Sequence, residues 1–84
     1  MRATGPVTIG RDVVYVHFTA EGRAARVRVS ADECDRLDLF AGRQVRVVLG
    51  GREPAVALVT AVVPAPPFAW VELELAAPAA SRAR

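Results

Sequence analysis

The chain has 84 residues, enough for one domain, and its hydrophobic content of 52% suits a packed core and argues against a disordered chain. The formal net charge of +2 comes from Arg82 and Arg84, because residues 1–75 carry nine arginines and nine acidic residues. A nucleic-acid-binding protein usually has a strong basic excess, since phosphate neutralisation supplies much of its affinity, and this domain has none.

Two strands joined by a tight turn are expected in the first third of the chain. Residues 11–19 and 24–30 both alternate between apolar and polar side chains, which is the period of a strand. A loop centred on Glu21 and Gly22 would pair Val16 with Val27, Val14 with Val29, His17 with Arg26 and Tyr15 with Arg28. A loop with an odd number of residues would set valine against arginine, so the pattern predicts a two- or four-residue loop.

A short helix is expected at residues 31–38. Ser30 and Glu33 have the spacing of a capping box, in which the hydroxyl and the carboxylate each accept from the other residue's backbone amide. Cys34 and Leu37 are three residues apart and therefore lie on one face of this helix. We expect that face to point toward the core.

Three further strands are expected in the second half of the chain. Residues 43–49 and 68–75 alternate, with valine and leucine on one face and Arg46 or Trp70 on the other. Residues 55–63 are apolar at nearly every position, which indicates a strand that is buried on two sides or paired across an interface. Turns rich in glycine or proline separate these strands.

The expected fold is mainly β: a small five-stranded barrel or roll with one short helix, in the order β-β-α-β-β-β. A helix of two turns cannot cover a whole sheet, whereas closing short strands into a barrel removes exposed strand edges. We expect residues 1–75 to form this single domain. Residues 76–84 have neither a period nor a large apolar side chain, and we expect them to form a flexible tail.

Few residues could support catalysis or bind a metal. Cys34 and His17 are the only cysteine and histidine, and the pattern places the thiol inside and the imidazole outside. We therefore expect no nucleophile–base pair and no enzymatic activity. One cysteine and one histidine are too few for a zinc site, and the acidic residues of the helix lack the spacing of a calcium loop. We expect neither a metal nor a cofactor.

A cytoplasmic location is expected. A single cysteine cannot form a disulfide within the chain, which suits a reducing compartment. The first ten residues lack the apolar segment of a signal peptide. The longest uncharged stretch is interrupted by three prolines, so we expect no membrane span: these are Pro64, Pro66 and Pro67.

The outer face of the first hairpin is one candidate binding surface. An aromatic side chain beside arginines can stack on bases and grip phosphates, although a solvated sheet face has a similar composition. Arg46 joins this surface if the strands at residues 24–30 and 43–49 pair. The residues we associate with nucleic-acid binding are Tyr15, His17, Arg23, Arg26, Arg28 and Arg46.

Phe68 and Trp70 form a second candidate surface, for binding a protein. Both follow the proline-rich turn, and Trp70 falls on the polar face of the last strand. Exposed aromatic residues beside a rigid loop are favoured anchors of protein interfaces. Alternatively, Trp70 covers the mouth of the barrel as part of the core.

Residues 26–59 resemble a known family. Val27-Arg28-Val29-Ser30, Leu37-Asp38-Leu39, Gly42 and Val45-Arg46-Val47 form a strand, a short helix, an L-x-L-x-x-G turn and a second strand. This order is similar to that of the AbrB/MazE-like swapped-hairpin regulators and the double-psi barrels, together the cradle-loop barrels. The resemblance implies a small cytoplasmic dimer. For the DNA-binding branch it implies a role for Arg23, Arg26 and Arg28, although Val29-Ser30 stands where Ile-Pro is usual.

The sequence favours a non-enzymatic β-barrel binding module that acts through protein association, as a homodimer. This hypothesis depends on the apolar strand at residues 55–63, on the expected exposure of Trp70 and on the neutral charge of the domain. The alternative is a dimeric nucleic-acid-binding transcriptional regulator, or an antitoxin-like protein, that uses the face containing arginine and tyrosine.

Overall fold

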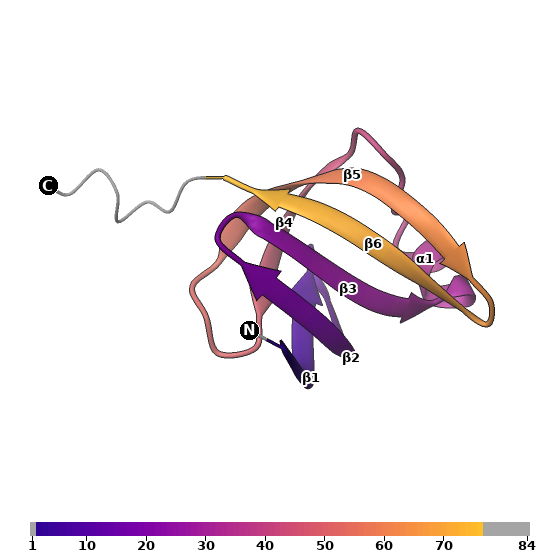
Figure 1. Ribbon diagram of the computed structural model, residues 1–84, viewed down its shortest axis with the longest axis horizontal. Helices are drawn as coiled ribbons and strands as arrows, with labels where there is room; N and C mark the ends of the chain where they lie inside the picture. Colours follow the sequence, from indigo (N-terminus) through magenta and orange to yellow (C-terminus); the bar gives the residue numbers. More distant parts are fainter. Residues whose placement is uncertain (1, 77–84) are drawn as a thin grey trace, which may run out of the picture.

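The computed structural model describes residues 2–76, which form a closed β-barrel with one short helix (Figure 1). The elements in chain order are β1 (Arg2–Ile9), β2 (Asp12–Glu21), β3 (Ala24–Ser30), α1 (Ala31–Arg36), β4 (Gln44–Leu49), β5 (Ala55–Ala65) and β6 (Phe68–Leu75). The expectation of a mainly β barrel with one short helix is confirmed. The predicted tail, residues 76–84, lies outside the described residues except for Ala76.

The barrel has six strands rather than five, because the first ten residues contain a strand that was not expected. β1 pairs with β2 along its whole length and also with β4, which closes the ring. Gly5 and Pro6 lie within β1, and both residue types weaken a strand pattern. The carbonyl of Pro6 accepts from the amide of Gly50 at 2.9 Å, so the missing N–H of Pro6 also faces the β4 side. No hydrogen bond to β2 is lost.

The strands follow each other around the ring in the order β1-β2-β3-β6-β5-β4, and all neighbours are antiparallel. The chain crosses from β3 to β4, on the far side of the ring, by way of α1. Inward-facing valines and leucines fill the barrel, together with the fully buried Phe18. Among residues 2–76, no helix is long and apolar enough to cross a membrane.

The hairpin of β2 and β3 has the predicted two-residue loop, but its register differs by two residues from the expected one. Phe18 pairs with Val27 and His17 pairs with Arg28, so the loop contains Gly22 and Arg23. Gly22 adopts a φ of +60°, and glycine at the first position of a two-residue loop is a favoured hairpin geometry. The loop has an even length, so the predicted inner and outer faces are preserved.

The helix has the predicted capping box but is shorter than expected. The amide of Glu33 donates to Ser30 Oγ at 3.0 Å, and the amide of Ser30 donates to Glu33 Oε1 at 3.2 Å. After the helix, the guanidinium of Arg43 donates to the carbonyls of Leu37 and Asp38. The bond to Leu37, the C-cap residue, satisfies one of the carbonyl groups that the end of a helix leaves without a partner.

β5 contains a β-bulge and is apolar on both faces, but it is not buried on two sides as expected, because Val56 is 50% exposed and Val63 is 41% exposed. Val59 pairs with Leu73 and Ala61 pairs with Glu72, so the register shifts between Val59 and Ala61. The inward positions are odd-numbered before the bulge and even-numbered after it. Thr60 Oγ1, at the bulge, donates to the carbonyl of Glu72 at 3.2 Å. A strand whose buried face changes parity loses its alternation in the sequence.

Candidate functional site

The two candidate surfaces lie on one continuous face, because β3 pairs with β2 on one side and with β6 on the other. One outward row across five strands illustrates this arrangement: Thr4, His17, Arg28, Trp70 and Val63 are successive cross-strand partners. We define the arginine–aromatic face as Tyr15, His17, Arg26, Arg28, Phe68 and Trp70.

Two arginines of β3 lie over two aromatic rings of β6. The guanidinium carbon of Arg26 is 4.7 Å from the centroid of the Trp70 ring, and that of Arg28 is 4.6 Å from the centroid of Phe68. Each arginine therefore contacts the ring diagonal to its direct cross-strand partner. Arg28 pairs with Trp70 but lies over Phe68, and Arg26 pairs with Glu72 but lies over Trp70. Cation–π contacts of this kind hold a guanidinium in place while leaving its outer surface open.

His17 and Glu72 complete the polar contacts of the face. The ring of His17 packs edge-on against Trp70, with centroids 6.1 Å apart and an angle of 81° between the planes. His17 Nδ1 lies 3.3 Å from Thr4 Oγ1. Arg26 Nε lies 3.6 Å from Glu72 Oε2, in a half-exposed pair of the kind that adds little to stability. Glu74 faces outward at the next outer position of β6, so the positive charge of the face lies mainly at Arg28.

The aromatic side chains of the face differ in exposure. Tyr15 is 74% exposed and Phe68 is 38% exposed, whereas Trp70 is half-buried. Trp70 points outward from β6, beneath Arg26, and its cross-strand partner Val63 is 41% exposed. The face therefore presents apolar surface beside its positive charge.

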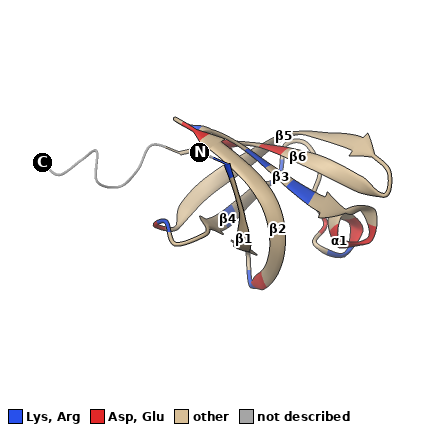
Figure 2. Ribbon diagram, turned by 60° about the horizontal axis from the view of Figure 1, so that its bottom comes forward, with Lys and Arg blue, Asp and Glu red and all other residues tan. Residues whose placement is uncertain are grey.

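The acidic helix lies next to this face. Figure 2 shows the red residues of α1 at the end of β3, beside the blue stretch of that strand. Asp32 and Asp35 are exposed on α1, and Glu33 is half-buried in the capping box. A positive and a negative region thus lie side by side on one part of the barrel.

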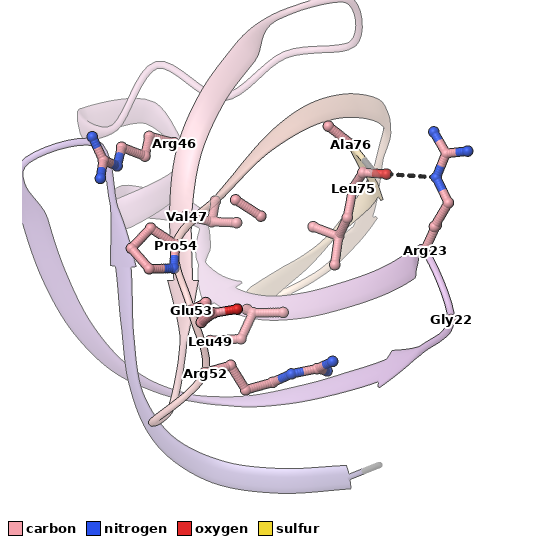
Figure 3. A pocket seen from close by; sticks show the side chains of 11 residues that line it. Gly22, Arg23, Arg46, Val47, Leu49, Arg52, Glu53, Pro54, Leu75 and Ala76 are labelled. Carbon is pink, nitrogen blue, oxygen red and sulfur yellow. Dashed lines mark hydrogen bonds between the residues drawn. The ribbon is translucent and has the colours of Figure 1, made fainter. Parts of the chain in front are cut away.

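Arg23 and Arg46 lie away from the face. β4 pairs with β1 and β5, so the expected pairing of residues 24–30 with residues 43–49 is wrong, and Arg46 lies on the other side of the ring. Arg23 lies in the turn after β2, where its Nε donates to the carbonyl of Leu75 at 2.9 Å. Both residues line a hollow at the end of the barrel (Figure 3).

Cys34 and His17 are separated by the barrel wall. Cys34 is buried, and its thiol lies 3.7 Å from the carbonyl of Leu39. Burial raises the pKa of the Cys34 thiol, and the nearby negative charge of Asp35 raises this pKa further. The thiolate needed for nucleophilic chemistry is therefore disfavoured. Within the described part of the chain, no group of three or more histidine, cysteine or acidic residues is arranged to hold a metal ion.

The pairing of β3 with β6 was the main feature that the sequence analysis missed. Arg26 and Arg28 alternate along one strand, and Glu72 and Glu74 alternate along the other. Opposite charges at alternating positions favour cross-strand pairing, and Arg26 is indeed the partner of Glu72. This pattern indicates that the two strands pair, but it does not fix the register, because Arg28 lies opposite Trp70 and Glu74 lies opposite Ala24.

No protein-family model, no curated protein and no solved structure matches the chain. The resemblance of residues 26–59 to the AbrB/MazE-like regulators and the double-psi barrels stays a prediction.

Proposed function

We propose that this barrel is a non-enzymatic binding module that associates with protein through the arginine–aromatic face. The observation that carries the proposal is the placement of Arg26 and Arg28 over Trp70 and Phe68. Arginine and tryptophan are enriched among the residues that dominate binding energy at protein interfaces. A guanidinium already held against a ring also loses less conformational entropy when a partner binds.

A second copy of the chain is the partner that we favour. Residues 1–75 have no net charge, but the positive face lies beside the exposed carboxylates of Asp32 and Asp35. A twofold axis between the two regions would set the face of each copy against the helix of the other. Such an interface is self-complementary and closes at two subunits.

We also propose that the module is cytoplasmic, and this location and the lack of enzymatic activity are inferred from Cys34 and from the composition. The single cysteine is buried with a raised pKa, which suits a structural thiol in a reducing compartment.

The association is tested by size-exclusion chromatography with light scattering on the full chain over a wide concentration range. We expect twice the mass of one chain, and a shift to the monomer for the double variant Tyr15→Ser, Arg28→Gln. Both side chains are exposed, so the circular dichroism spectrum of this variant should stay unchanged. Val56→Ser is the control, because Val56 is 50% exposed on β5 beside Arg46 and outside the face.

Two outcomes would contradict the proposal. A wild-type chain that stays monomeric at the highest concentration would exclude self-association. A dimer that the Tyr15→Ser, Arg28→Gln variant leaves intact, or that Val56→Ser weakens equally, would place the interface elsewhere.

Single-stranded nucleic acid is the second candidate ligand, and the exposure of Tyr15 and Phe68 favours it. Bases can stack on such rings while arginines contact the phosphates. If two phosphates are contacted, a plot of the logarithm of the binding constant against the logarithm of the salt concentration should have a slope of roughly −1.4, at about −0.7 for each contact. Fluorescence anisotropy with a labelled oligonucleotide measures this slope. The double variant Arg26→Gln, Arg28→Gln should abolish this salt dependence. No binding at low salt would rule out this candidate.

A further inference from the structure

The first half of β2 has a neighbouring strand on one side only. β2 pairs with β1 from Asp12 onward, but its ladder with β3 begins at His17. β3 continues beyond Arg28 to Ser30, and there it pairs with β6 alone. Figure 1 shows β2 and β3 separating with distance from their shared turn. Residues 12–16 therefore form an open edge of β2 on the side of β3.

The backbone groups of Val13 and Tyr15 point toward this open edge. In an antiparallel ladder, alternate residues bond to opposite neighbours, and the two residues that flank a two-residue loop bond to each other. Glu21 flanks the loop and bonds to β3, so every second residue before it faces the same side. Val13 and Tyr15 belong to this series but have no partner on β3, whereas Val14 bonds to β1. Their N–H and carbonyl groups are therefore open to a partner, and no hydrogen bond within residues 2–76 engages them.

The open edge lacks the features that usually keep an exposed strand from pairing with another chain. Its outward side chains are apolar, since Val13 is 65% exposed and Tyr15 is 74% exposed. Proteins often protect such edges with lysine, proline or other interruptions. Residues 12–16 contain one charged residue, Asp12, whose carboxylate lies 3.5 Å from the guanidinium of Arg36. The edge itself therefore carries no unpaired charge.

Arg28 determines which charge a partner on this edge should carry. It is exposed, lies over the ring of Phe68, and is opposite His17 at the point where the ladder of β2 with β3 ends. Within residues 2–76, the arginines that form ion pairs are Arg26 and Arg36, so Arg28 has no carboxylate partner. A strand added beside β2 would end next to Arg28. A carboxylate on the outer face of that strand would form a charge-assisted contact with this guanidinium.

We propose that the open edge of β2 binds an extended acidic peptide, which adds to the sheet as an antiparallel strand. The peptide backbone would exchange hydrogen bonds with Val13 and Tyr15, and an acidic side chain opposite Tyr15 would contact Arg28. Strand addition takes its affinity from main-chain hydrogen bonds and its specificity from alternate side chains. The inference rests on the proposed function in taking the arginine–aromatic face as a protein-binding surface, and it adds the backbone of β2 and the conformation of the partner.

Backbone amide NMR of the full chain, titrated with the peptide acetyl-Thr-Glu-Thr-Val-Thr-amide, tests the proposal. In the free protein, the amide hydrogens of Val13 and Tyr15 should exchange rapidly with solvent. Those of Val14 and Val16 should exchange slowly, because they bond to β1. The peptide should slow the exchange at Val13 and Tyr15 and shift their signals with saturation. Slow exchange at these two residues in the free chain, or shifts confined to other strands, would overturn the proposal.

Modified peptides separate strand pairing from charge attraction. Methylating the nitrogens of the glutamate and the valine removes the two donors that face β2 and should weaken binding about tenfold or more. Methylating the nitrogen of the central threonine alters a group that faces away from β2 and should leave the affinity nearly unchanged. Equal affinity of the two methylated peptides would reject strand addition. Lysine in place of the glutamate should also weaken binding about tenfold or more, and an unchanged affinity would reject the contact with Arg28.

Two protein variants locate the acidic contact. Arg28→Gln removes an exposed guanidinium beside the open edge and should weaken peptide binding about tenfold. Arg46→Gln makes the same change of charge on the other side of the ring and should leave the affinity unchanged. Equal weakening by both variants would show a general effect of charge and reject the site.

The peptide titration and the light-scattering measurement fail separately. A dimer in which Val13 and Tyr15 do not respond to the peptide would overturn this inference alone. Peptide binding by a chain that stays monomeric would support this inference and overturn self-association alone.

Discussion

Gly50 combines two constraints that the other glycines of the barrel carry singly or not at all. Its φ of +58° lies in the left-handed region, which costs a residue with a side chain about 1–2 kcal/mol. A Cβ at this position would also approach the Phe18 ring to 3.3 Å. Gly10 has a similar φ of +64°, but a Cβ there would meet no atom within 4 Å.

We therefore expect Gly50→Ala to lower the free energy of unfolding by more than Gly10→Ala does. Gly10→Ala should cost about 1–2 kcal/mol from the backbone alone, and Gly50→Ala should add a steric cost against Phe18. Urea denaturation followed by circular dichroism measures both values. Equal losses for the two variants would show that Phe18 moves aside without cost.

At the scale of single elements, α1 is short and depends on its cap. The helix has six residues, too few to be stable by itself, and both hydrogen bonds of its capping box are formed. Cys34 faces the core, and the helix packs on β3 and β6. The cap therefore contributes to the anchoring of the helix beside the arginine–aromatic face.

Ser30→Ala should lower the free energy of unfolding by about 1 kcal/mol, because the amide of Glu33 loses its acceptor. Ser30→Thr keeps a hydroxyl at the same place and should restore most of this loss. Chemical denaturation of the three proteins checks the order of stability. A Ser30→Ala protein as stable as the parent would show that water replaces the hydroxyl without cost.

Strands with a clean alternation could be predicted together with their inner faces, β5 was predicted as a strand at residues 55–63 but without its inner face, and β1 was not predicted. β2, β3, β4 and β6 bury one face and expose the other, so their boundaries and inner faces were predicted well. β1 contains Gly5 and Pro6, and β5 contains the bulge at Thr60. The hairpin register was wrong because parity fixes which side chains face inward but not which pairs lie opposite each other.

At the scale of the whole molecule, the candidate residues could be identified from the sequence, but their grouping on one face could not. Arg26, Arg28, Phe68 and Trp70 were each identified as binding candidates, yet in two separate surfaces. Their union depends on the pairing of β3 with β6, which lie far apart in the sequence. The same topology separates Arg23 and Arg46 from that face. Long-range strand pairing is the information that local patterns lack.

The closed ring also limits how a partner can bind. Every strand has a neighbour on both sides, from β1 with β2 and β4 round to β6 with β3 and β5. Many sheet proteins recognise an extended peptide by β-augmentation, in which the peptide extends the sheet through main-chain hydrogen bonds at an open edge. Here most backbone groups around the ring are engaged in pairing, although β1 pairs with β4 only from Val7 to Ile9 and β2 pairs with β3 only from His17 to Glu21. Where the strands are paired on both sides, as β3 and β6 are, specificity must reside in side chains, and point substitutions can redirect it without disturbing the scaffold.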